Sequence, residues 1–344
     1  MDSDPRAQVE PAAERADRRP SDAGSPDARG GGSRRDALVI TGPTATGKTA
    51  LSIEVAERLD GEIISMDSRQ VYRGMDIGTA KATNEERARV PHHGLDLVDP
   101  DERYSAGRYA RDARRWITEI RERGRVPILV GGTGFFLRSL THPLFREPEM
   151  PESARERLKR WLDRQPIEEL RRWLHRLDPV TAGSLAARGG RQRVARALEV
   201  ALLSGKPLSW WHREAPTEAP ALSLLIFVLS LPREMLYRRI NERVVEMVEA
   251  GLVDEVRGLL ERGYDVDDPG MSGTAYPEMS AYLKGEWSLD EAIDATQRAT
   301  RRYARRQLTW FRHQLPEDAV WLDATRPRDE LVSTIVETWR RGEG

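Results

Sequence analysis

The sequence of 344 residues contains no cysteine. This absence excludes disulfide bonds, zinc sites built from thiolates and catalytic cysteine nucleophiles. Lysine is scarce as well, because only five of the 55 basic residues are lysines and the others are arginines. Arginine offers planar forks of donors that suit phosphate, although a GC-rich genome would produce the same bias.

The chain also lacks long apolar runs. No run approaches the roughly 20 residues that span a bilayer, and the N-terminus has no apolar stretch of a signal peptide. The net charge is −1, so no overall field of one sign points to a nucleic-acid partner. We therefore expect a cytoplasmic protein without membrane segments. The length allows one large domain or two modest ones.

The composition changes near residue 36. Residues 1–35 have almost no large apolar side chains, so they cannot offset the entropy of ordering, and we expect a disordered tail. Beyond it, four apolar segments predict buried parallel strands at residues 37–40, 62–66, 126–130 and 222–229. Helical patterns separate these segments, which indicates an α/β fold with a doubly wound sheet.

Residues 141–221 have a different pattern, with amphipathic helices predicted at 155–163, 168–177 and 191–203 and no strand among them. We interpret this region as an all-helical insertion into the α/β core. The core then occupies residues 36–140 and 222–325, with basic helices near its end. Residues 326–344 are expected to form a C-terminal helix or tail.

Residues 42–49 match the phosphate-binding pattern G-x-x-x-x-G-K-[ST]. They are Gly42, Pro43, Thr44, Ala45, Thr46, Gly47, Lys48 and Thr49. A predicted strand enters this loop and a helix leaves it, which places backbone N–H groups at a helix N-terminus. Lys48 is expected to reach a terminal phosphate oxygen, and the Thr49 hydroxyl to bind magnesium. The sequence therefore predicts a polyphosphate site.

Asp67 follows the second predicted strand, at the edge of the sheet where ligands bind. It fits a magnesium ligand or a general base, and a solvated turn residue is the alternative without a chemical role. The third strand ends at Gly131, Gly132 and Thr133, where glycines would let backbone approach a ligand and Thr133 could donate to a bridging oxygen. A simple turn explains these residues equally well. Lys81 is a candidate for a second diphosphate contact.

A basic stretch lies near the C-terminus. Five arginines share one helical face, with Trp310 and Phe311 beside it; they are residues 298, 301, 302, 305 and 306. Such a stripe suits a nucleic-acid backbone and an unstacked base. A solvated face balanced by nearby acids is the alternative. Residues 191–199 form a second basic cluster within the predicted insertion.

Over about residues 37–325 the chain resembles the bacterial tRNA dimethylallyltransferases. The resemblance rests on the motifs at residues 42–49, 67–72, 74–81, 130–134, 192–199 and 305–310. It implies a P-loop NTPase-like fold and transfer of a dimethylallyl group from dimethylallyl diphosphate, with release of diphosphate. The acceptor would be the exocyclic amine of the adenosine 3′ of the anticodon in tRNA.

The resemblance also implies roles for residues. Asp67 would be the general base, Thr133 would assist departure of diphosphate, and Lys48 and Thr49 with magnesium would neutralise its charge. The tRNA contacts would be Asp67, Ser68, Arg69, Gln70, Thr133, Arg155, Gln192, Arg193, Val194, Ala195, Arg196, Tyr276, Arg305 and Arg306. The helical insertion would grip the anticodon stem-loop.

One segment departs from the family's pattern. Near residues 272–278 the family usually has a Gly-Tyr pair, then a basic residue and Glu or Gln. Tyr276 and Glu278 match, but Pro277 stands in the basic position and removes a backbone donor. We expect a phosphate contact to be lost, which puts tRNA affinity or choice in question.

Two other functions use the same motifs. A small-molecule kinase would bind ATP at residues 42–49, with Asp67 on magnesium. A non-catalytic tRNA-binding relative would explain the change at Pro277. We expect a monomer because no heptad seam is visible. The sequence leaves open which tRNAs are used and what the N-terminal tail does.

Overall fold

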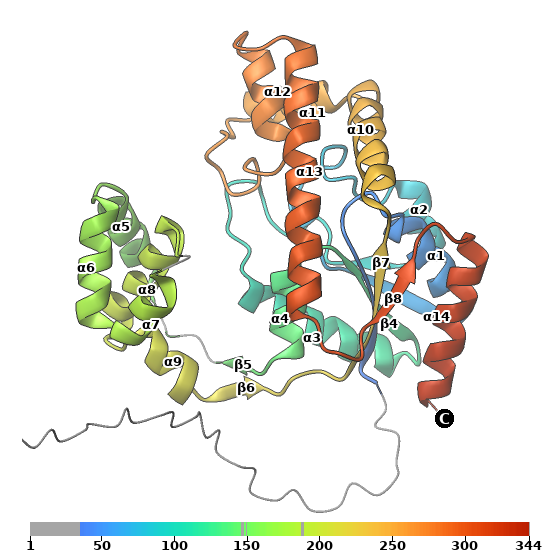
Figure 1. Cartoon of the computed structure of the whole chain (residues 1–344), viewed down its shortest axis with the longest axis horizontal. Coiled ribbons are helices and arrows are strands. Elements are labelled where there is room, and N and C mark those ends of the chain that lie inside the picture. The colour runs from blue at the N-terminus through green and yellow to red at the C-terminus, as the bar shows by residue number, and fades with distance from the viewer. Residues whose placement is uncertain (1–34, 146–147, 149, 187–188, 344) are drawn as a thin grey trace, which may run out of the picture. The chain divides into compact units, whose positions relative to one another are not determined.

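The computed structural model describes residues 35–145, 148, 150–186 and 189–343 (Figure 1). The tail predicted for residues 1–35 lies outside them, apart from Arg35. A sheet of six parallel strands has the order β3-β2-β4-β1-β7-β8. The strands are β1 (Ala37–Thr41), β2 (Gly61–Ser65), β3 (His92–His93), β4 (Val126–Gly131), β7 (Leu224–Ser230) and β8 (Val320–Asp323). The predicted doubly wound sheet is confirmed; only the short edge strands β3 and β8 are not expected from the sequence.

Each face of the sheet is covered by helices. Ala37 and Val39 of β1 belong to the apolar core on one face, and Leu38 and Ile40 to the core on the other, because successive side chains alternate along a strand. The first face packs against α3 (Ala106–Glu122), α4 (Gly134–Thr141) and α13 (Leu289–Gln314); the second packs against α1 (Lys48–Leu59) and α14 (Arg328–Glu343). Burial on both faces explains why these strands are continuous apolar runs.

Further helices extend the core beyond the sheet. They are α2 (Asn84–Arg89), α10 (Arg233–Glu249), α11 (Leu252–Glu261) and α12 (Tyr276–Leu283). In Figure 1, α10 follows β7 and lies beside α13, while α12 packs against both α11 and α13. In the described part of the chain no helix is both long enough and apolar enough to cross a membrane. Even α13, with 26 residues, carries arginines along its length.

The insertion forms a small core of its own. Its helices are α5 (Glu152–Asp163), α6 (Ile167–Leu177), α7 (Pro179–Leu185), α8 (Arg191–Ser204) and α9 (Leu208–Glu214). Leu162, Leu170, Leu174 and Leu198 pack together inside it. The strands β5 (Leu144–Phe145) and β6 (Thr217–Ala219) pair antiparallel and flank these helices. The region is therefore not entirely helical, and strands this short leave no alternating pattern in the sequence.

Ala275, which directly precedes α12, has a backbone conformation that favours glycine. Its φ is 84° and its ψ is −37°, and its side chain is buried. A side chain in this region of φ/ψ space costs of order 1–3 kcal/mol. The chain therefore carries backbone strain at this position.

We expect Ala275→Gly to raise the free energy of unfolding by about 1 kcal/mol, because the relieved strain exceeds the added entropy of the unfolded chain. Urea unfolding followed by circular dichroism measures the change. Ala295→Gly, within helix α13, is the matched control and should lower stability by a similar amount. A loss of stability in both variants would show that position 275 is not strained.

Candidate active site

A cavity of about 470 Å³ opens at the carboxyl edge of the sheet. Its walls come from the phosphate loop, the segment after β2, the end of β4, and helices α10 and α13. Among its lining residues are Lys48, Thr49, Asp67, Arg69, Gln70, Gly132, Arg243, Tyr276, Tyr303 and Gln307. The cavity thus joins the predicted polyphosphate loop to the predicted base.

The phosphate loop depends on its glycines. Gly42 has a φ of 144°, and a Cβ there would lie 2.6 Å from the carbonyl oxygen of Leu229. Gly47 has a φ of 88° and stands immediately before α1, so Lys48 is the first residue of that helix. The Lys48 Nζ donates to the carbonyl oxygens of Gly42 at 2.9 Å and Pro43 at 2.7 Å. These bonds hold the ammonium against the loop that precedes the helix N-terminus.

The electrostatics of the cavity act on Lys48. Burial and the nearby positive charge of Arg243 lower the pKa of Lys48 from 10.5 to about 7, while the charge of Asp67 opposes this shift. Near neutral pH the side chain is therefore poised between its charged and neutral forms. An anion bound beside it would favour the ammonium.

Asp67 lies two residues beyond β2. Its Oδ1 accepts a hydrogen bond of 2.8 Å from the Arg69 backbone N–H, which fixes the carboxylate in a turn. Burial and the charge of Asp67 raise the pKa of Tyr303 to about 12, against the opposing charge of Arg69. The carboxylate therefore faces a phenol that stays protonated and the two cations Lys48 and Arg243.

Thr133 precedes α4 and is bonded to the Asp67 segment. Its Oγ1 accepts from the Ser68 backbone N–H at 3.0 Å and donates to the Ser68 hydroxyl at 3.4 Å. The neighbours Asp67 and Gly132 line the cavity, whereas Ser68 and Thr133 do not. The predicted leaving-group residue is thus adjacent to the cavity and held by the segment that carries the predicted base.

Gly131, the last residue of β4, and Gly132, which follows it, are both in close contact with other parts of the protein. A Cβ at Gly131 would lie 2.1 Å from the Met66 carbonyl oxygen, and one at Gly132 would lie 2.2 Å from the Gln307 Nε2. These glycines admit neighbouring protein groups, whereas the sequence left open a close approach to a ligand and a simple turn.

Gln307 is a site residue that the sequence analysis did not assign. Its Oε1 accepts from the Thr44 backbone N–H at 3.0 Å, and its Nε2 donates to the Gly132 carbonyl oxygen at 2.9 Å. The buried amide therefore joins the phosphate loop to the end of β4. The residue belongs to a motif quoted above, but its arginine neighbours Arg305 and Arg306 are more conspicuous.

Arg239 and Arg243 of α10 also line the cavity and are not predicted from the sequence. Within the described ranges neither forms an ion pair, and burial lowers the pKa of Arg243. Their spacing of four residues places both on one face of a helix, which is the signal that could have identified them.

The predicted tRNA contacts near the cavity already have protein partners. The Arg69 guanidinium donates to the Pro269 carbonyl oxygen at 2.6 Å. Tyr276 is fully buried, and its hydroxyl donates to Glu255 Oε1 at 2.8 Å. Both side chains therefore hold the 269–276 segment in place at the cavity.

The other predicted contacts lie on two separate parts of the chain. In the insertion, Arg155 and Arg196 both pair with Glu199, at 2.9 and 2.6 Å. Gln192 and Arg193 are exposed, Ala195 is half-buried and Val194 belongs to the insertion core. Arg305 and Arg306 are exposed on α13.

The arginines of α13 gather around a second hollow of about 200 Å³. It is lined by Tyr237, Arg298, Arg301, Arg302 and Arg305. Of these arginines, only Arg298 pairs with a carboxylate in the ranges the structure describes, that of Asp294. By helical spacing they lie opposite Tyr303 and Gln307, which line the first cavity. This surface is an unbalanced basic face outside the cavity.

Two protein-family descriptions match this chain. The one described as IPP transferase matches residues 70–314, and the one described as isopentenyl transferase matches residues 35–92. The first covers more than half of the chain. The chain belongs to the IPP transferase family.

Curated relatives in this family match nearly the whole chain. A tRNA dimethylallyltransferase of Geobacter metallireducens is 46% identical over 302 residues, which are 87% of this chain and 96% of the relative. One of Geobacter sulfurreducens is 47% identical over 281 residues, or 82% of this chain and 90% of the relative.

Solved structures of IPP transferases agree with the fold. The full-length tRNA isopentenylpyrophosphate transferase of Bacillus halodurans is 40% identical, with a TM-score of 0.65 over 90% of this chain and 97% of that one. A eukaryotic dimethylallyltransferase acting on tRNA is 28% identical, with a TM-score of 0.71 over 85% of this chain and 74% of that one. The P-loop NTPase-like sheet with its insertion is therefore the fold of the family.

The low pKa of Lys48 is directly measurable because the chain has only five lysines. Reductive methylation with ¹³C-formaldehyde labels the lysines that the reagent reaches for NMR, and Lys48 lines the open cavity. We expect the Lys48 signal to titrate with a midpoint of about 7 and saturating pyrophosphate to raise that midpoint, because the anion favours the ammonium. Lys48→Met identifies the signal by its loss. A midpoint near the ordinary lysine value of about 10.4 would contradict the prediction.

Gln307→Leu tests the bridge between α13 and the phosphate loop. The change leaves the Thr44 N–H and the Gly132 carbonyl without their partner, and an unpaired buried polar group costs about 1–3 kcal/mol. We expect stability to fall and the Kd of pyrophosphate, measured by calorimetry, to rise about tenfold, or 1.4 kcal/mol. Gln314→Leu removes an exposed amide of α13 that bonds Arg138 and should change neither quantity. Equal effects of the two changes would refute a specific role for Gln307.

Proposed function

We propose that this IPP transferase transfers a dimethylallyl group from dimethylallyl diphosphate to tRNA. The acceptor is the exocyclic amine of the adenosine 3′ of the anticodon, and diphosphate is released. One observation carries the proposal: the phosphate loop with Lys48 and the carboxylate of Asp67 line the same cavity. The relatives named tRNA dimethylallyltransferase support the choice of donor and acceptor. We further propose that the protein acts in the cytoplasm as a monomer.

The donor's diphosphate would bind at the N-terminus of α1. Backbone N–H groups there attract an anion, and Lys48 and Arg243 supply positive charge beside it. Binding would raise the pKa of Lys48, so the ammonium is fully formed when the diphosphate leaves. Stabilising charge that develops on a leaving group is a direct way to lower a barrier.

The cavity fits magnesium that takes most of its ligands from diphosphate and water. No group of three or more His, Asp or Glu in the described ranges could enclose a metal ion. The cavity offers the Thr49 hydroxyl, which forms no hydrogen bond with the other described residues, and the carboxylate of Asp67. Such a sparse set suits Mg²⁺, which usually keeps several waters. When bound, it would supply further positive charge to the diphosphate oxygens.

Asp67 would act on the acceptor. The adenosine amine attacks the allylic carbon of the donor, the carbon–oxygen bond to diphosphate breaks, and Asp67 takes the amine proton. Its Oδ1 is fixed by Arg69 N–H, which orients the carboxylate for this transfer. Thr133, bonded to Ser68, would then turn its hydroxyl to the departing bridging oxygen.

The tRNA must present its adenosine outside the base stack, which costs a few kcal/mol. Exposed Gln192 and Arg193 on the insertion, and exposed Arg305 and Arg306 on α13, are the groups we assign to the anticodon stem-loop. Phosphate contacts by arginine are salt-dependent and carry no sequence information. These arginines would therefore bind the stem-loop without regard to its sequence, and contacts with bases would select the tRNA.

Asp67→Asn tests the proposed base. Purified protein is incubated with magnesium, dimethylallyl diphosphate and unmodified tRNA that has adenosine 3′ of the anticodon, and nucleosides are analysed by mass spectrometry. We expect prenylated adenosine from the wild type and a kcat lower by about 10²–10⁴-fold in the variant, the usual contribution of a general base. The KM of the donor should change little, because the phosphate loop is intact.

Asp329→Asn is the control for loss of a carboxylate. Asp329 is exposed on α14, which packs on the same sheet face as α1, and it does not line the cavity. It should leave the rate unchanged. Phosphoryl transfer from ATP in the absence of tRNA would instead indicate a kinase. Binding of tRNA with no product from any variant would indicate a non-catalytic relative.

A further inference from the structure

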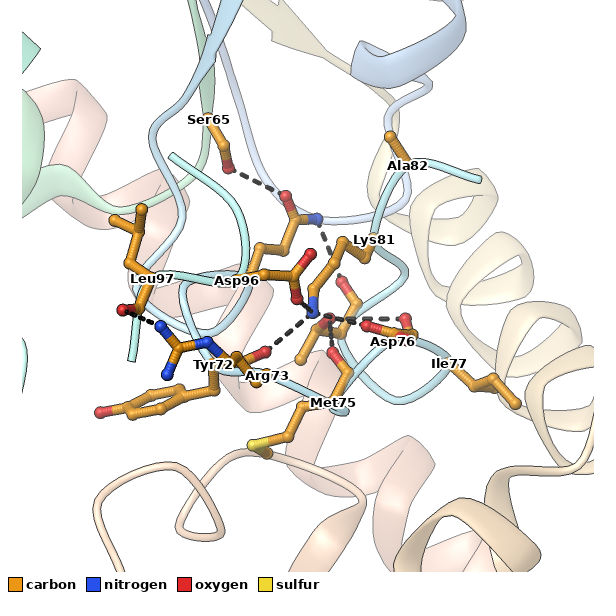
Figure 2. A network of polar contacts seen from close by, with 12 residues as sticks. Ser65, Tyr72, Arg73, Met75, Asp76, Ile77, Lys81, Ala82, Asp96 and Leu97 are labelled. Carbon is orange, nitrogen blue, oxygen red and sulfur yellow. Dashed lines mark hydrogen bonds and ion pairs between the residues drawn. The ribbon is translucent and has the colours of Figure 1, made fainter. Parts of the chain in front are cut away.

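Lys81 has one of the most enclosed charges in the molecule, and its role differs from the one the sequence suggests. Its side chain is only 1% exposed, so the diphosphate contact considered above is wrong. Figure 2 shows the ammonium between Asp76 and Asp96. The Nζ donates to Asp76 Oδ1 at 2.5 Å, Asp96 Oδ1 at 2.6 Å and the Tyr72 carbonyl oxygen at 2.8 Å.

All three ammonium donors are therefore in use. The second oxygen of Asp96 accepts from Arg87 at 3.0 Å, so each group of this cluster has a partner. We call Lys81, Tyr72, Asp76, Asp96 and Arg87 the Lys81 socket. The cluster is costly to break at its carboxylates, because the ammonium of Lys81 is buried and would lose its compensating charge. The socket is thus a fixed point of the segment that follows β2.

The Lys81 socket holds Gln70, which lines the catalytic cavity. The Asp96 backbone N–H donates to the Gln70 carbonyl oxygen at 3.3 Å. The Gln70 amide donates to the carbonyl oxygens of Thr79 at 3.2 Å and Ala80 at 3.1 Å, the two residues before Lys81. Ser65, at the end of β2, donates to the Gln70 Oε1 at 2.9 Å. Both the backbone and the side chain of Gln70 therefore depend on residues that the socket fixes.

A second clamp acts on the same loop from α11. Glu255 Oε2 accepts from the backbone N–H groups of Asp76 at 2.8 Å and Ile77 at 2.7 Å. Glu255 Oε1 accepts from Gly78 N–H at 3.0 Å and from the Tyr276 hydroxyl. Gly78, Thr79 and Ala80 line the cavity, so this wall is held at both of its ends.

We propose that Lys81 is a positioning residue for the acceptor base. It fixes the cavity wall made by Gln70 and residues 78–80. The adenine would lie against this wall, which would set its position relative to Asp67. None of the described hydrogen bonds of the Lys81 socket reaches the phosphate loop, so the donor site is independent of it. This proposal rests on the proposed function, because the adenine that Lys81 would help to place belongs to the tRNA acceptor.

Lys81→Met keeps the length of the side chain and removes its charge. We expect kcat/KM for tRNA to fall about 100-fold, the scale of loss produced by misplacing a reacting group by about 1 Å. The Kd of pyrophosphate should stay within about twofold of the wild type, which a general loss of folding would not allow. Lys81→Arg should not rescue the rate, because a planar guanidinium does not match three acceptors around one ammonium.

Asp76→Asn is the milder variant in case Lys81→Met does not fold. The Asp76 side chain is 60% exposed, so the change weakens one contact of the socket without burying an unpaired charge. We expect the same pattern at smaller size: a lower kcat/KM for tRNA and an unchanged Kd of pyrophosphate. Lys284→Met, at an exposed lysine after α12, is the control and should change neither.

The decisive measurement is a double-mutant cycle between Lys81→Met and Gln70→Ala on kcat/KM for tRNA. If Lys81 acts through Gln70, the double variant should lie within about threefold of the more impaired single variant, because coupled residues are not additive. Fold losses that simply multiply, or a Kd of pyrophosphate that rises with the loss of activity, would overturn the proposal. A wild type that makes no prenylated tRNA would instead overturn the proposed function, and this assignment with it.

Discussion

Parallel pairing of β1 with β4, and of β4 with β2, is the constraint on which the site depends. Adjacent strands lie about 4.8 Å apart, so loops that leave their carboxyl ends begin side by side. The Thr41 hydroxyl donates to the Gly131 carbonyl oxygen at 2.7 Å and ties two of these strand ends together. The phosphate loop, the Asp67 turn and the Gly132–Thr133 turn follow directly. A donor site and a base in one cavity are therefore consequences of the sheet's topology.

Half-buried Lys48 and buried Lys81 show why this arginine-rich chain keeps lysine at particular positions. Lys48 is a point charge whose pKa can fall to about 7 and rise again when an anion binds, a range that arginine cannot reach. Lys81 fills a socket of three acceptors arranged around one nitrogen. Arginines instead take positions that use two nitrogens of the fork, such as Arg89, whose Nε and Nη2 donate to the two carboxylate oxygens of Glu57 at 2.9 Å each. At both positions the compact ammonium group therefore has a property that a guanidinium lacks.

The parts of the site that come from short continuous motifs could be predicted from the sequence, and the contacts between segments far apart in the chain could not. The parallel strands, the phosphate loop and Asp67 come from contiguous patterns, and the family match extends them over most of the chain. Gln307 and Arg243 enter the same cavity from helices that lie more than a hundred residues beyond Asp67, and nothing in the chain near them indicates that they face the phosphate loop. The reason for Gly132 stayed open between a ligand and a simple turn, because the side chain of Gln307 that needs the space lies far away in the sequence.

Pro277 does not disturb the architecture around α12. Pro277 is the second residue of α12, where a backbone N–H has no partner within the helix, so proline is tolerated. Glu278 still accepts from the Ala275 N–H at 3.0 Å and starts the helix, and Tyr276 still holds Glu255. Glu255 in turn holds the N–H groups of residues 76–78 in the cavity wall. The contacts of this segment with the cavity wall are therefore present. The presence of Pro277 is therefore compatible with every hydrogen bond by which Tyr276 and Glu278 support the cavity wall.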